Sequence, residues 1–120
     1  MNILIADESR LNRLQLKSYI HQIWPIAVVY EESNLDAVIA DVFDQNYDLL
    51  IIDIAVPGNE NIKDFITQAV KYTKVIVFSE TNNDEVKIKW INDIGVDAFL
   101  WKSASKENIL SILMFVLSEV

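Results

Sequence analysis

The sequence predicts an α/β domain in which a five-stranded parallel β-sheet is covered by helices on both faces. Four short apolar runs each end in polar residues: residues 3–6 before Asp7 and Glu8, 49–52 before Asp53, 75–78 before Ser79, and 98–101 before Lys102. Runs of this kind are typical of parallel strands that are buried on both faces. Helix-like segments separate them, and such an alternation folds into a parallel sheet through right-handed crossovers.

The element boundaries follow from these runs and from the segments between them. We expect strands at residues 2–6, 26–31, 48–53, 74–79 and 97–101. We expect helices at residues 9–24, 33–46, 61–72, 83–94 and 105–119. Pro25 ends the first helix, since proline cannot continue one.

Each expected helix has apolar residues spaced three or four positions apart, which places them on one face. In chain order, these faces contain Leu16, Tyr19, Ile20 and Ile23; Leu35, Val38, Ile39, Val42 and Phe43; Ile62, Phe65, Ile66, Ala69 and Val70; Val86, Trp90, Ile91 and Ile94; and Ile109, Leu110, Leu113, Val116 and Leu117. Ser33 is a candidate N-cap of the second helix. Gly95 is a candidate C-terminal cap of the fourth helix.

Composition limits the function classes that remain. The chain has 120 residues, which we interpret as one domain spanning 1–120, and its 52% apolar content argues against disorder. A net charge of -8 argues against direct contact with nucleic acid. The lack of cysteine excludes disulfides, thiolate zinc sites and cysteine nucleophiles. With no basic leader and no apolar stretch of roughly 20 residues, we expect a cytoplasmic protein without membrane contact.

The polar residues at the strand ends predict the functional site. In an open parallel sheet, the site lies outside the carboxyl ends of the strands, so three carboxylates, a hydroxyl and an ammonium should converge there. Carboxylates at close range repel one another unless a cation lies between them. Mg²⁺ is the natural cation, because it prefers one or two carboxylates together with waters and phosphate oxygens.

The order of these residues resembles the receiver domain of two-component response regulators, chemotaxis receivers included, over essentially the full chain. Asp7 and Glu8 resemble its acidic pair, and residues 53–58 (DIAVPG) resemble its D-x-x-M-P-G motif, with Asp53 at the phosphoacceptor position. Ser79 matches its Ser/Thr position. Residues 95–102 (GVDAFLWK) resemble its G-A-D-G-[YF]-[LV]-x-K motif, which ends in Lys102. The resemblance implies a flavodoxin-like sheet with strand order 2-1-3-4-5.

The resemblance also implies a mechanism. Asp53 would accept a phosphoryl group from a histidine kinase or a histidine phosphotransfer protein. Mg²⁺ would be held by Asp7, Glu8, Asp53 and the carbonyl of Ala55, and Lys102 would pair with a phosphoryl oxygen. Ser79 would donate a hydrogen bond to another oxygen, after which Phe99 would turn inward as the switch aromatic. Such a chain is not an enzyme towards other substrates, since it promotes only its own phosphorylation and dephosphorylation.

Four positions depart from the family pattern. Val56 replaces a methionine, and Asn61 replaces a glycine, for which asparagine is a tolerable substitute where φ is positive. Ser103 replaces a proline whose preceding peptide bond is generally cis, so this bond is either trans or strained. Glu80 follows Ser79 where the family has a small residue, and its carboxylate would crowd the pocket or repel phosphate.

Three other functions compete with this interpretation. A phosphatase of the haloacid-dehalogenase type needs a second acid two residues after the nucleophile, where this chain has Ala55. A flavodoxin-like flavin carrier needs a Ser/Thr-rich loop after the first strand, where this chain has Asp7 and Glu8. The third alternative keeps the receiver fold but acts as an interaction module independent of phosphorylation, which Glu80 and Ser103 favour.

Two helices carry apolar residues outside their core faces. Leu11 and Leu14 lie close to the acidic pocket and are either a kinase-docking surface or two isolated surface leucines. In the last helix, Ile112 and Phe115 lie away from the core face. Together with Trp101, they predict contact with a second copy of the chain or with an output domain. The alternative is a slightly rotated helix that buries Phe115.

Overall fold

The computed structural model describes residues 1–56, 58–80 and 85–118. Five parallel strands form one sheet in the order β2-β1-β3-β4-β5, which confirms the predicted fold and strand order. The strands are β1 (Asn2–Ala6), β2 (Val28–Glu32), β3 (Leu49–Ile52), β4 (Lys74–Ser79) and β5 (Ala98–Trp101). The helices are α1 (Arg10–Ile23), α2 (Leu35–Asp44), the short 3₁₀ helix η1 (Asn59–Asn61), α3 (Ile62–Ala69), α4 (Glu85–Ile94) and α5 (Lys106–Leu117).

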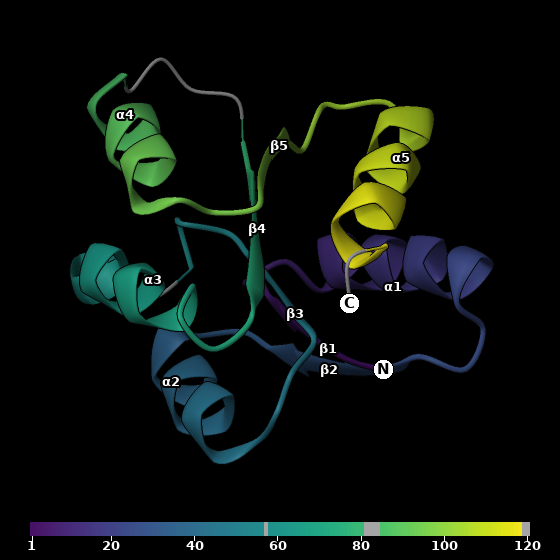
Figure 1. Cartoon of the computed structure of the whole chain (residues 1–120), viewed down its shortest axis with the longest axis horizontal. Coiled ribbons are helices and arrows are strands. Elements are labelled where there is room, and N and C mark those ends of the chain that lie inside the picture. The colour runs from purple at the N-terminus through teal and green to yellow at the C-terminus, as the bar shows by residue number, and fades with distance from the viewer. Residues whose placement is uncertain (57, 81–84, 119–120) are drawn as a thin grey trace.

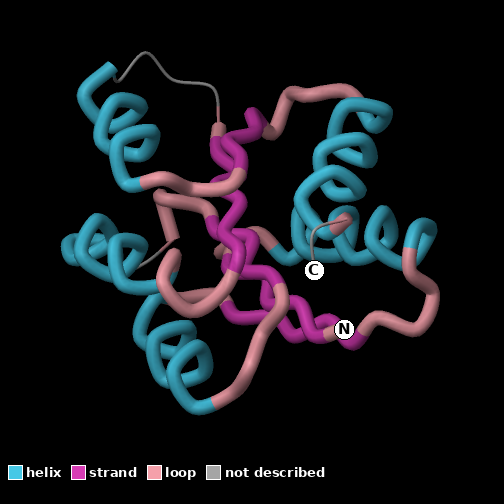
Figure 2. Tube along the Cα trace, viewed as in Figure 1, coloured by secondary structure: helices cyan, strands magenta, loops and turns pink. Residues whose placement is uncertain are grey.

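The helices form one layer on each face of the sheet. Helices α2, α3 and α4 cover one face, and α1 and α5 cover the other (Figure 1). The sheet lies between the two layers as a single twisted ribbon of strands (Figure 2). Within residues 1–56, 58–80 and 85–118, no helix has the length and apolarity needed to cross a bilayer.

The sheet separates two apolar cores, because successive side chains of a strand point to opposite faces. In β1, Leu4 belongs to the core under α2, α3 and α4, while Ile3 and Ile5 belong to the core under α1 and α5. All three side chains are fully buried. A central strand of this sheet therefore needs apolar residues at every position, which is the pattern that predicted it.

Two elements, β2 and α2, begin two residues later than predicted. Strand β2 begins at Val28 rather than at residue 26, because the N–H of Ala27 donates to the carbonyl of Trp24 (3.1 Å) and closes a turn through Pro25 and Ile26. Ser33 is not the N-cap of α2. The side chain of Asn34 takes that role, accepting a hydrogen bond from the N–H of Ala37 (2.9 Å).

Four local predictions are settled by backbone geometry and exposure. Gly95 follows α4 with a φ of +91°, so it is the C-terminal cap as predicted. Asn61 has a φ of -109°, so this position does not require the positive φ that asparagine tolerates. The bond between Lys102 and Ser103 is trans, because no described peptide bond is cis. Val86 is 75% exposed and not part of the core face, since it lies in the first turn of α4, ahead of the buried Ile91.

The predicted ends of two helices cannot be compared with the structure. Residue 83, where the fourth helix was expected to begin, and residue 119, where the fifth was expected to end, lie outside the described residues. The described parts of α4 and α5 fall within the predicted ranges.

Candidate functional site

The sheet places the predicted site residues at the carboxyl ends of β1, β3 and β5. Strands β1 and β3 are neighbours, with Ala6 opposite Ile52, so the next residues, Asp7 and Asp53, also lie side by side. The N–H of Asp53 donates to the carbonyl of Ala6 (2.9 Å) and extends this pairing. A cavity of about 510 Å³ opens at this edge and is lined by Asp7, Glu8, Ser9, Asn12, Asp53, Ala55, Glu80 and Lys102.

Lys102 bridges the two buried carboxylates. Its Nζ lies 2.7 Å from Oδ2 of Asp7 and 2.7 Å from Oδ2 of Asp53. The side chains of Lys102, Asp7 and Asp53 are 8%, 4% and 8% exposed, so water screens this ion pair weakly. Through these two salt bridges, Lys102 connects the end of β5 to the ends of β1 and β3.

This environment determines the charge state of Lys102. Burial lowers the pKa of Lys102, but hydrogen bonds and attraction from Asp53 and Asp7 outweigh it and raise the pKa above the usual 10.5. The side chain is therefore a firmly charged ammonium at neutral pH, which suits pairing with an anion.

Backbone N–H groups hold the other oxygen of each carboxylate. Oδ1 of Asp7 accepts a hydrogen bond from the N–H of Ser9 (2.8 Å), and Oδ1 of Asp53 accepts one from the N–H of Ala55 (2.9 Å). Ser9 is also the N-cap of α1, since its side chain accepts from the N–H of Asn12 (3.3 Å). These short-range bonds fix the carboxylates before any ligand binds.

The donor set fits a magnesium ion. Four carboxylates line the cavity, namely Asp7, Glu8, Asp53 and Glu80, and Lys102 is the one cation among the lining residues. Among the described residues, the buried Oδ2 of Asp7 has no partner besides that ammonium. The described residues hold no preformed group of three or more His, Cys, Asp or Glu side chains that could bind a metal ion. Mg²⁺ requires no such group, since one or two carboxylates, a carbonyl and waters suffice.

Two predicted residues lie outside this cavity. Ser79 is 2% exposed at the end of β4, and its carbonyl accepts a hydrogen bond from the N–H of Lys102 (2.8 Å). Phe99 is half-buried against the core under α2, α3 and α4, and its ring packs edge-on against Trp101 at 4.6 Å between centroids. The structure therefore brings Asp7, Glu8, Asp53, Ala55 and Lys102 together and leaves Ser79 and Phe99 beside them.

The structure adds residues that the sequence did not indicate. Ser9 and Asn12 line the cavity, and Arg13 binds the loop from outside it, donating from Nη1 to the carbonyl of Asp7 (2.6 Å). An arginine in the first turn of a helix that follows an acidic pair indicates a contact with that loop only when the neighbouring strand is known. Glu80, noted as a departure from the family pattern, does line the cavity and is exposed there.

The structure also places the apolar residues that were predicted to lie outside the core faces of α1 and α5. Leu11 and Leu14, at the start of α1, are 76% and 46% exposed. Phe115 is 65% exposed, so the alternative of a rotated α5 that buries it is wrong. Ile112 is half-buried against the core under α1 and α5, and Trp101 is also half-buried.

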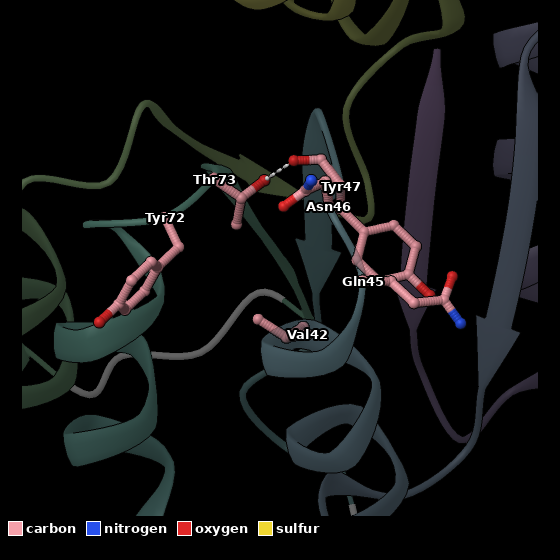
Figure 3. A pocket seen from close by; sticks show the side chains of 6 residues that line it. All are labelled: Val42, Gln45, Asn46, Tyr47, Tyr72 and Thr73. Atoms are coloured by element: carbon pink, nitrogen blue, oxygen red, sulfur yellow. Dashed lines mark hydrogen bonds between the residues drawn. The ribbon is translucent and has the colours of Figure 1, made fainter.

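A second cavity, of about 290 Å³, lies at the opposite, amino-terminal edge of β3 and β4. Its lining carries no charged side chain: Val42, Gln45, Asn46, Tyr47, Tyr72 and Thr73 (Figure 3). Oγ1 of Thr73 donates to the carbonyl of Tyr47 (2.9 Å), which ties the two loops together. Its lining thus lacks the charges that distinguish the first cavity.

Comparisons with known proteins agree with this geometry. The family model of the response regulator receiver domain matches residues 3–114. The nitrate/nitrite response regulator protein NarL of Escherichia coli K12 is 27% identical over 113 residues, which cover 92% of this chain and 52% of that protein. The chain thus spans about half the length of the curated relatives it matches.

Solved structures share the fold at low sequence identity. A CheY-like response regulator receiver from Methanospirillum hungatei JF-1 superposes with a TM-score of 0.82 at 20% identity, covering 98% of this chain and 94% of that one. The isolated receiver domain of RcsB from Salmonella enterica serovar Typhimurium, solved with the phosphomimetic BeF₃⁻, gives 0.81 at 20% identity, covering 99% and 96%.

Proposed function

The chain belongs to the response regulator receiver domain family of two-component systems, and on this basis we propose that Asp53 is its phosphoacceptor. The observation that carries the proposal is the pair of buried carboxylates, Asp7 and Asp53, that share the ammonium of Lys102 at 2.7 Å each. Buried charges of this kind are costly to maintain, and they concentrate at functional sites.

In the proposed reaction, a carboxylate oxygen of Asp53 attacks the phosphorus of a phosphohistidine on a histidine kinase or a histidine phosphotransfer protein. A bond forms between that oxygen and phosphorus, the bond between phosphorus and the imidazole nitrogen breaks, and the electron pair stays on the nitrogen. The N–H of Ala55, which already binds Oδ1 of Asp53, keeps the carboxylate oriented for this attack.

The residues around Asp53 divide the remaining tasks. Asp7, Glu8, Asp53 and the carbonyl of Ala55 would hold Mg²⁺. A bound Mg²⁺ supplies positive charge that offsets the charge on the phosphoryl oxygens. Lys102 would pair with one phosphoryl oxygen, and the hydroxyl of Ser79 would donate to another. The chain would promote only its own phosphorylation and dephosphorylation.

The proposed output is a surface change. Movement of Ser79 towards the phosphoryl group would let Phe99 turn inward, which changes the packing of Trp101 against it. Partner surfaces are proposed at two places: Leu11 and Leu14 beside the site for the kinase, and the α5 surface around Phe115 for a second copy or an output domain.

The test is phosphorylation by a small donor. Wild-type protein incubated with acetyl phosphate and Mg²⁺ should gain one phosphate adduct by intact-mass spectrometry, and omission of Mg²⁺ or addition of a chelator should prevent it. Asp53→Asn should gain none, because the amide cannot form the acyl phosphate. Asp64→Asn, a matched change at an exposed aspartate on α3, should behave as wild type.

Two outcomes contradict the proposal. An adduct that persists unchanged in Asp53→Asn would assign the phosphate to another residue. No adduct in the wild type, with the domain folded, would favour a receiver that acts as an interaction module without phosphorylation, as Glu80 in the cavity lining suggests.

A further inference from the structure

We propose that Arg13 is a positioning residue that fixes the loop carrying Asp7 and Glu8 in its metal-binding shape. The inference rests on the proposed function, since it concerns the same acidic site. Arg13 lies in the first turn of α1, and its side chain is 15% exposed. It is absent from the residues that line the cavity, so it acts on the loop from behind.

The guanidinium binds the backbone of both acidic residues. Nη1 of Arg13 donates to the carbonyl of Asp7 (2.6 Å) and to the carbonyl of Glu8 (3.2 Å). The N–H of Asp7 donates to the carbonyl of Glu32 in β2 (3.1 Å). The backbone of Asp7 is thus held on its N–H side by the sheet and on its carbonyl side by Arg13, which leaves its carboxylate a narrow range of positions.

A second charged contact keeps Arg13 in place. Nε of Arg13 lies 3.1 Å from Oε1 of Glu31, and Nζ of Lys17 lies 3.9 Å from Oε2 of the same carboxylate. Glu31 is fixed in turn by its place in β2, opposite Ile5 of β1. Only a guanidinium offers separate donors to the loop and to Glu31 in one rigid plane, so a lysine cannot replace all of these bonds.

Positioning and simple electrostatics predict opposite effects on metal binding. If the charge of Arg13 mattered alone, its removal would make the site more negative and strengthen binding of a divalent cation. If Arg13 holds the loop, its removal weakens binding, because residues that orient metal ligands typically contribute a factor of about 10 to 100 in affinity. The direction of the change therefore distinguishes the two.

The experiment measures the affinity for Mg²⁺ by isothermal titration calorimetry at fixed ionic strength. Arg13→Met should bind Mg²⁺ about tenfold more weakly than wild type. Arg13→Lys should recover part of the loss, and Glu31→Gln should cause a smaller loss, because Arg13 keeps its carbonyl contacts. Arg10→Met, which removes the same charge from an exposed position of α1, should bind as tightly as wild type or slightly more tightly.

A double variant separates positioning from a general structural defect. Arg13→Met combined with Glu31→Gln should bind Mg²⁺ no more weakly than Arg13→Met alone, because both changes interrupt one connection. Should Arg13→Met fail to fold by circular dichroism, the Arg13→Lys and Glu31→Gln affinities carry the test. In that case, affinities equal to wild type in both variants overturn the inference.

The failure of this inference differs from failure of the proposed function. If wild type binds Mg²⁺ and Arg13→Met binds it as tightly or more tightly, the positioning role is overturned. The proposal that Asp53 is the phosphoacceptor then still stands. Lack of Mg²⁺ binding and of the phosphate adduct in wild type overturns the proposed function, and the role of Arg13 with it.

Discussion

The two halves of the site are built differently. In the acidic half, Asp7 and Asp53 are each held by a backbone N–H two residues ahead, and both are buried. In the other half, Ser79 is equally buried, but Phe99 and Trp101 are half-buried and contact each other at the rim. The residues proposed for chemistry are therefore fixed in advance, whereas the aromatic side chains at the rim are partly exposed to solvent.

Lys102 is where the two halves meet, and removing its charge should have the largest effect. Lys102→Met should lower the free energy of unfolding by about 3 kcal/mol at neutral pH, because it leaves two buried carboxylates without a counter-charge. Urea unfolding followed by circular dichroism measures this. Lys63→Met, at an exposed position of α3, is the matched control and should change little.

Two further measurements test the same ion pair. Millimolar Mg²⁺ should return part of the lost stability to Lys102→Met, since a bound cation stabilises the folded state. The raised pKa of Lys102 implies that its contribution is complete below about pH 10.5 and is lost as pH rises through the folded-state pKa. Wild type should therefore lose more stability than Lys102→Met in that alkaline range. Equal unfolding midpoints for Lys102→Met and Lys63→Met would refute the bridging role.

A substitution of Glu80 tests whether the carboxylate of this residue in the cavity lining repels anions. In the proposed site, Glu80→Gln should strengthen binding of beryllofluoride at saturating Mg²⁺ and weaken binding of Mg²⁺ itself, each by about threefold to tenfold. The side chains have nearly the same size, so the effect reports charge rather than crowding. Glu107→Gln, at an exposed position of α5, should change neither affinity. Changes in the same direction for both ligands, or none, would show that Glu80 does not act through charge.

The smallest effect on the fold is expected at the α5 surface. Phe115→Lys should change the free energy of unfolding by no more than about 0.5 kcal/mol, because the ring is 65% exposed. Beryllofluoride and Mg²⁺ should promote self-association of the wild type in sedimentation, and Phe115→Lys should abolish it. Ile26→Lys, at a 93% exposed position, should retain that association. If Phe115→Lys also retains it, α5 is not the contact between copies.

Sequence patterns predicted the fold well where burial is complete. The runs at 3–6, 49–52 and 75–78 are continuous because these strands are covered on both faces, and the structure has strands there. Strand β2 was placed two residues early because it is an edge strand whose apolar residues are partly exposed, Val28 at 47% and Tyr30 at 37%. An apolar residue there does not mark where pairing begins.

The residues of the site also differ in how far the sequence predicts their contacts. Asp7, Asp53 and Lys102 could be predicted to meet because each directly follows a strand, and parallel strands end at one edge. The contact between Arg13 and Glu31 could not be predicted, although only 18 positions separate the two residues. It depends on the exact rotation of α1 over the sheet, which no local pattern encodes.

Under the proposed function, the bridge from Lys102 to both aspartates would also affect the order in which ligands bind. In the folded protein the ammonium of Lys102 offsets part of the charge of the two carboxylates. Asp7 and Asp53 would share their oxygens between a bound cation and this ammonium, which would leave Lys102 free to pair with an incoming anion. The metal would therefore bind before the phosphoryl group. Lys102 would change its partner from the two carboxylates to the phosphoryl group.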